Sequence, residues 1–322
     1  MNRRAELVIA LALLATTRVD AREVDQFTDR TFQRQHLTDA SAILDARMNA
    51  ILKAIVAELN AKRPSTQRER DDLIYGAFQG SRVELVAQIR SPFEAWVRED
   101  APVTLFSVDA RGVYGGEVDY DDMGLAYYIE VSPVLRLGPV LVGLDKLGHF
   151  LGQGWFYYRE YRMLRDRDPH ASDDDLLRGV RKYGHDQEAG YLGLTGTGVY
   201  AYADLAANWS GLQFYLALFS GPDPYLVLAN GSYRQAREFR FSDYVTDAWD
   251  EALNPSRPRT PRFFDKVARY LRAHVCAAYR TDPDAFLGAS GHMQDPREYV
   301  WEGAIDGVFA AKRFALAEVC RR

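Results

Sequence analysis

The spacing of apolar residues predicts a chain built mainly of helices. Apolar positions recur at intervals of three and four residues over 38–60, which predicts a helix there. The same reasoning predicts further helices over 81–99 (broken near Pro92), 145–165, 172–189, 199–219, 262–280 and 297–322. Between residues 103 and 131 the pattern changes to short β-branched and aromatic runs separated by glycine, which predicts a small β-hairpin or sheet. Without a repeat or a clear linker, we expect residues 22–322 to form a single mostly helical domain.

The first 21 residues, MNRRAELVIALALLATTRVDA, have the pattern of a cleaved signal peptide. Two arginines precede a short apolar run, and Val19 and Ala21 are the small residues expected before a cleavage site. The run is short for a membrane span, although an N-terminal membrane anchor is the alternative. No cysteine follows the run, so we do not expect a lipid to be attached there. The protein is therefore expected to be periplasmic or secreted.

Composition and cysteine content agree with an exported globular protein. Hydrophobic residues make up 47% of the chain and the net charge is −5. No stretch is dense in lysine and arginine, so nucleic acid is not an expected partner. The two cysteines, Cys276 and Cys320, predict a disulfide in an oxidising compartment, and two buried free thiols are the alternative.

Three segments rich in apolar and small residues each carry a pair of polar side chains at helical spacing. The pairs are Asp145 with His149, His185 with Glu188, and Asp204 with Asn208. Spacings of three or four residues place both members on one helix face. Burying such groups without partners is costly. We therefore expect them to pair with one another, bind an ion or bind a polar ligand.

The sharper hypothesis is a metal site made by facing helices. Its candidate ligands are Asp145, His149, His185, Glu188 and Asp204. Two imidazoles with carboxylates suit zinc, manganese or iron better than calcium. In a catalytic version, Glu188 or Asp204 is the general base, and Asn208 and Lys146 hold the substrate.

The plainer alternative is that these polar groups form a structural hydrogen-bond network. In that case Asp145 caps a helix, and the side chain of Lys146 extends to water. The segment WDEALNPS at 249–256 adds a similar ambiguity. Its Asp250 and Glu251 contribute carboxylates to the site, or the segment is an ordinary turn.

Two short motifs resemble a known group of proteins. The segment DKLGHF and the later DLAANWSG resemble the paired motifs of VanZ-like proteins and of YfiM-type bacterial envelope lipoproteins. The matching positions are Asp145, Lys146, His149, Asp204, Asn208 and Gly211. The resemblance covers these motifs alone. It implies a bacterial envelope protein and carries no activity with it. VanZ-like proteins are integral to the membrane and the YfiM type is lipid-anchored, whereas here we expect a plain signal peptide and buried core helices.

The leading functional hypothesis is an exported metal-dependent hydrolase or transferase that acts on an envelope component such as a lipid, phosphate ester or glycan. The alternative is a non-catalytic periplasmic scaffold or partner-binding protein whose polar cluster is structural. A third option is a membrane-embedded protein of the VanZ type.

Overall fold

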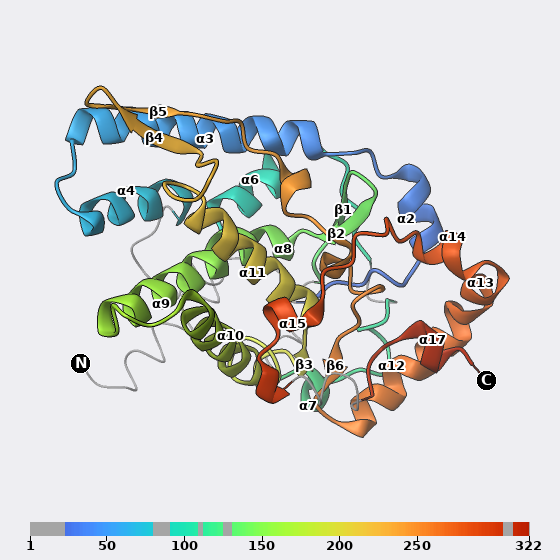
Figure 1. The fold of residues 1–322 in the computed structure, drawn as a ribbon. Helices are drawn as coiled ribbons and strands as arrows, with labels where there is room; N and C mark the ends of the chain where they lie inside the picture. Colours follow the sequence, from blue (N-terminus) through green and yellow to red (C-terminus); the bar gives the residue numbers. More distant parts are fainter. Residues whose placement is uncertain (1–22, 80–90, 109–111, 125–130, 305–311, 322) are drawn as a thin grey trace, which may run out of the picture.

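The computed structural model describes residues 23–79, 91–108, 112–124, 131–304 and 312–321. The described residues are mainly helical, as predicted, and the strands form only small antiparallel pairs (Figure 1). The expected signal peptide lies outside the described residues. Residues 81–90, the first half of the helix expected over 81–99, also lie outside the described residues. Its second half is α6 (Pro92–Glu99), which Ser91 caps by accepting a hydrogen bond from the Phe93 amide.

The N-terminal part forms one long edge of the molecule. The helices α2 (Arg30–His36) and α3 (Ser41–Lys62) are followed by α4 (Gln67–Gln79). The hairpin of β4 (Leu226–Ala229) and β5 (Ser232–Gln235) lies along α3 (Figure 1). Asn60 fixes this contact, because its amide donates to the Tyr233 carbonyl and its side-chain oxygen accepts from the Tyr233 amide.

The predicted small hairpin is present and begins just after the expected range. Strands β1 (Val134–Leu137) and β2 (Val140–Gly143) are antiparallel, and Val134 lies opposite Gly143. Gly138 has a φ of 58° and makes the turn between them, a conformation that glycine adopts without strain. From the expected range itself, Phe106 pairs with Val134 through two backbone hydrogen bonds. The short helix α7 (Tyr120–Met123) also lies there.

The central helices follow directly from this hairpin. A single helical run contains α8 (Asp145–Gly148), the π-helical turn η2 (His149–Gln153) and α9 (Gly154–Arg167). It packs against α10 (Asp173–Ala189) and α11 (Tyr202–Leu216), as Figure 1 shows. The helix expected over 199–219 starts later, because β3 (Val199–Tyr200) pairs with β6 (Arg257–Pro258).

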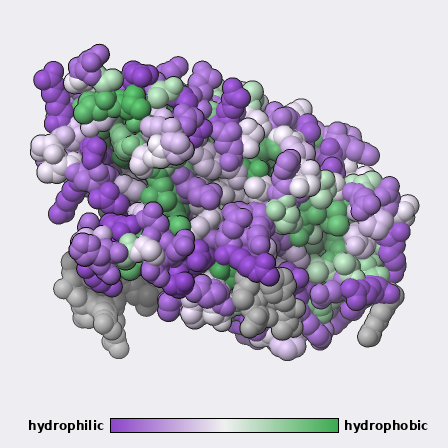
Figure 2. Space-filling view, viewed as in Figure 1, coloured by the Kyte–Doolittle hydropathy of each residue, from purple (hydrophilic) through white to green (hydrophobic). Residues whose placement is uncertain are grey.

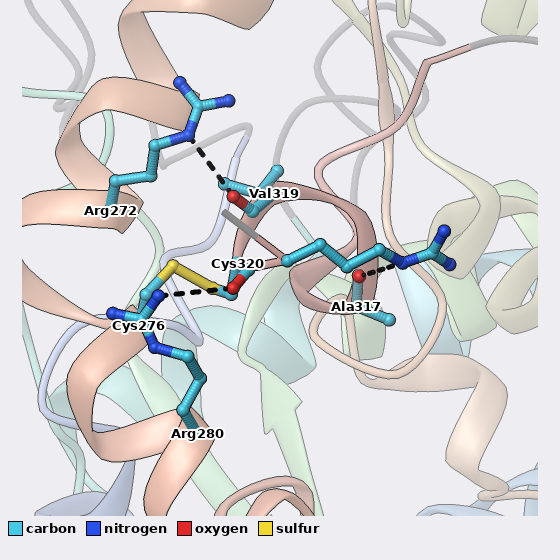
Figure 3. Close-up of a disulfide and its surroundings, with 7 residues drawn as sticks. Arg272, Cys276, Arg280, Ala317, Val319 and Cys320 are labelled. Atoms are coloured by element: carbon cyan, nitrogen blue, oxygen red, sulfur yellow. Dashed lines mark hydrogen bonds between the residues drawn. A yellow bond between two sulfur atoms is a disulfide. The ribbon is translucent and has the colours of Figure 1, made fainter.

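The C-terminal part is a set of shorter helices. The single-turn elements η3 (Phe241–Asp243) and η4 (Asp247–Trp249) precede it. Its helices are α12 (Pro261–His274), α13 (Cys276–Thr281), α14 (Pro283–Leu287), α15 (Pro296–Tyr299) and α17 (Leu316–Val319). The predicted disulfide between Cys276 and Cys320 is confirmed and joins α13 to the end of α17 (Figure 3). Arg272 and Arg280 donate to the carbonyls of Val319 and Cys320 beside it.

Buried apolar side chains gather in two main cores. The larger one lies around α3, α4, α9 and α11, and the smaller one joins α12, α13 and α17 to residues 113–123. Hydrophilic residues cover most of the face in Figure 2, with a hydrophobic area where Figure 1 draws the β4–β5 hairpin. That hairpin carries Leu228, which is 61% exposed. Among the described helices, none combines the length and apolar character needed to cross a bilayer.

Candidate functional site

A buried lysine lies at the centre of three carboxylates. The ammonium of Lys146 lies 2.8 Å from Asp145 Oδ2, 2.6 Å from Asp204 Oδ1 and 2.8 Å from Glu251 Oε1. Its side chain is 1% exposed. The possibility that Lys146 extends to water is therefore wrong. The side chain leaves the first turn of α8 toward Glu251, in the loop after η4. Burial lowers the pKa of Lys146, but the three carboxylates outweigh it and hold the pKa well above its usual range.

His149 links this cluster to Asn208. Its Nε2 lies 3.1 Å from Asp204 Oδ2, and its Nδ1 lies 3.0 Å from Asn208 Oδ1. The Asn208 amide donates to the Tyr157 hydroxyl, so its oxygen faces the imidazole and accepts from Nδ1. This arrangement directs Nε2 toward Asp204. Burial lowers the pKa of His149, but the Asp204 charge and its hydrogen bond outweigh it and raise the pKa to about 9.

Local backbone features bring these side chains together. The π-helical turn η2 starts at His149, and such turns occur often at functional sites. Glycines permit the close approach of α11 to this turn. A Cβ on Gly154 would lie 2.6 Å from the Gly211 Cα, and a Cβ on Gly211 would overlap the carbonyl oxygen of Phe150. Asp204 and Asn208, one turn apart on α11, therefore both reach His149. Asp145 does not cap α8, because Leu144 occupies the cap position.

Three side chains of the cluster have the composition of a metal site. One ligand atom from each of Asp145, His149 and Asp204 lies within 4.8 Å of the other two. Two carboxylates with one imidazole suit zinc, manganese or iron. The hydrogen bond from His149 Nδ1 to Asn208 is the kind that fixes the orientation of a metal-ligating histidine. Lys146 competes with an ion here, because its ammonium already contacts both carboxylates.

Further buried acids surround this group. The Glu188 carboxylate accepts a 2.7 Å hydrogen bond from the Ala201 amide, and burial and the Asp204 charge raise its pKa to about 8. Burial also raises the pKa of Glu251 to about 8, although Lys146 opposes the shift. Burial raises the pKa of Glu23 well above its usual range, and Glu251 and Asp204 add to this shift.

Carboxyl groups outnumber basic side chains in the cluster. Burial raises the pKa of Asp204, but His149 and Lys146 outweigh it and hold the pKa well below its usual range. Four buried carboxylate oxygens of the cluster accept no hydrogen bond from the described residues. They are Glu23 Oε2, Asp145 Oδ1, Glu251 Oε2 and Asp204 Oδ1, the last of which still lies 2.6 Å from the Lys146 ammonium. Buried acceptors without donors are costly, and a cation, a proton or an ordered water relieves that cost.

Two of the candidate residues lie outside the cluster. His185 bonds the Tyr200 hydroxyl through Nδ1 at 2.9 Å, and its ring lies 5.2 Å from that of Trp301. The structure therefore does not bring His185 to the Asp145–His149–Asp204 group, because β3 supplies its partner instead. Asp250 forms a fully buried ion pair with Arg30 at 2.6 Å. Of the two acids in the 249–256 segment, only Glu251 reaches Lys146.

Two residues that contribute to the cluster were not identified from the sequence. Glu23 lies in an extended segment directly after the expected cleavage site, and no helical spacing marks it. The sequence marks Tyr157 only as a core aromatic residue, although its hydroxyl accepts the hydrogen bond that positions Asn208. Among the members of the cluster, His149 is the most exposed, with 18% of its side chain accessible. A cavity of about 1020 Å³ lies elsewhere, beside α12.

Comparison with known proteins does not assign the chain to a family. No protein-family model, no curated protein and no solved structure matches this chain. The function is therefore argued from the chemistry of the site itself.

Proposed function

We propose that the protein is an exported, metal-dependent hydrolase or transferase that acts on a component of the bacterial envelope. The observation that carries the proposal is the convergence of Asp145, His149 and Asp204, whose ligand atoms lie within 4.8 Å of one another. These three residues would hold a zinc, manganese or iron ion. The ion would supply Lewis-acid chemistry at a substrate oxygen.

The surplus of buried carboxyl groups over basic side chains supports the presence of a cation. Five acids (Glu23, Asp145, Glu188, Asp204 and Glu251) are buried in or beside the cluster. The basic groups that contact them in the described structure are Lys146 and His149. A divalent ion would favour ionisation of these acids and provide a partner for Asp145 Oδ1.

The geometry also supports roles for the surrounding residues. Glu188 is the candidate general acid or base, because its pKa of about 8 lies near neutrality. Asn208 positions the imidazole instead of a substrate, since both ends of its amide are already bonded. Lys146 holds three carboxylates in place through its ion pairs, so it is a positioning residue. The partial exposure of the His149 side chain supports the approach of a substrate to this residue.

The test is an activity screen on the full mature chain with metal supplied or removed. Substrates are p-nitrophenyl phosphate, p-nitrophenyl acetate, phospholipid vesicles and peptidoglycan fragments. We expect turnover of one class, loss of it after chelation, and loss of it in His149→Ala. His185→Ala is the matched control, because it removes an imidazole outside the cluster and should remain active. Full activity of His149→Ala would overturn the proposal.

The second candidate function is a non-catalytic envelope scaffold, and one observation favours it. Lys146 already supplies a cation to three carboxylates in a nearly sealed position. On this account the cluster fixes the register of α8 against α11. His149→Ala would then lower the melting temperature, and neither wild type nor variant would bind a metal.

A further inference from the structure

The cavity beside α12 is separate from the acidic cluster. It has a volume of about 1020 Å³ and is lined by α12 and by residues from 28–29, 106–108 and 112–118. This is the size of pockets that hold small organic ligands. None of its described lining residues belongs to the acidic cluster.

The charged side chains that the structure describes on the cavity wall balance one another. Asp29 and Glu117 carry the negative charges, and Lys266 and Arg269 carry the positive ones. Arg269 is paired with Glu117, and Lys266 is paired with acids at the start of α7. The described part of the wall therefore offers no net field that would attract a polyanion such as a phosphate ester.

The uncharged part of the wall consists mainly of glycine, valine and small polar residues, and Phe106 and Tyr270 add two aromatic rings to it. The Tyr270 hydroxyl lies 3.1 Å from Thr28 Oγ1, which itself donates to the buried Asp25 carboxylate at 2.6 Å. Tyr270 is therefore the donor to Thr28, and its ring is fixed. The backbone of Phe106 is fixed by its pairing with Val134. Walls fixed before binding lose little conformational freedom when a ligand enters.

We infer that this cavity binds a neutral, hydroxyl-rich ligand, namely a short oligosaccharide. Sugar hydroxyls donate to carboxylates such as Asp29 and accept from cations such as Arg269, so they match a wall of both signs. The apolar C–H faces of a sugar ring pack on rings such as Tyr270. A fatty acyl chain would instead displace water from the charged groups without replacing its hydrogen bonds.

The test titrates the full mature chain with maltotriose and with triacetylchitotriose by calorimetry. Inorganic phosphate and dodecanoate are the comparison ligands. The key variant is Ala273→Trp, which puts a large ring into the cavity from an exposed position of α12. Tyr191→Ala is the control, because this tyrosine is 47% exposed and does not line the cavity. Thermal unfolding checks that each variant is folded.

We expect at least one trisaccharide to bind, and Ala273→Trp to weaken its affinity by about tenfold or more. Tyr270→Ala should weaken it as well, and the control should bind like wild type. His149→Ala should also bind the sugar normally, so this result is separable from the fate of the metal site. The inference is overturned if neither sugar binds, if Ala273→Trp binds as well as wild type, or if phosphate or dodecanoate binds in place of the sugars.

Discussion

Replacing Lys146 by methionine tests the electrostatic account of the cluster. The side chain keeps its apolar stem and loses the ammonium that lies within 2.8 Å of Asp145, Asp204 and Glu251. All four side chains are at most 5% exposed, so water does not replace the lost partner. The variant therefore leaves three buried carboxyl groups without their shared cation.

The expected loss follows from what broken buried ion pairs cost. Removing one partner of such a pair destabilises a protein by roughly 3–5 kcal/mol. Protonation limits the loss here, because the pKa of Glu251 is already about 8. We therefore expect a decrease of about 3 kcal/mol in unfolding free energy, or roughly 6 °C in melting temperature for a chain of this size.

The assay is urea unfolding followed by circular dichroism at pH 7. The matched control is Lys182→Met, whose side chain is 53% exposed and pairs with Asp186 one turn away on α10. An exposed pair of this kind is worth less than about 0.5 kcal/mol. Adding Asp145→Asn to Lys146→Met should recover part of the loss, because it removes one uncompensated charge. Equal stability of Lys146→Met and Lys182→Met would refute the reasoning.

Three further predictions concern packing, the disulfide and pH. Gly211→Ala should destabilise the protein by about 2 kcal/mol or more, because its Cβ would overlap the backbone of η2, whereas Gly76→Ala, with open space around it, should not. Reducing the Cys276–Cys320 bond, whose partners are 44 residues apart, should lower the unfolding free energy by roughly 4 kcal/mol, measured in urea with and without reductant. Burial raises the pKa of Asp25, so its stabilising contribution is full below its usual pKa and is lost as pH rises through the raised value. Asp25→Asn should remove this slope from a stability–pH profile.

The sequence was informative where helical spacing and burial act together. Asp145, His149, Asp204 and Asn208 are polar residues one turn apart in apolar helices, and the cost of burying them implies partners. The expectation that His185 joins the same cluster failed, because β3 supplies the Tyr200 hydroxyl as its partner. Spacing shows that a polar group needs a partner without showing which group provides it.

The remaining members depend on tertiary contacts that no local pattern encodes. Glu251 comes from a loop and Glu23 from an extended segment, so neither has a periodic neighbour that marks it. The direction of Lys146 depends on its contacts with Asp204 on α11 and with Glu251 in the loop after η4. The position of the hairpin depended on Gly138, since the turn at that glycine places both strands after residue 131.

Elemental analysis of the mature protein, purified without chelators or a histidine tag, tests the central claim most directly. The account predicts about one equivalent of zinc, manganese or iron per chain, retained in His185→Ala and lost in His149→Ala and Asp204→Ala. Wild-type protein that contains no metal, and takes up none when zinc, manganese or iron is added, would contradict it and leave Lys146 as the only cation that the three carboxylates share.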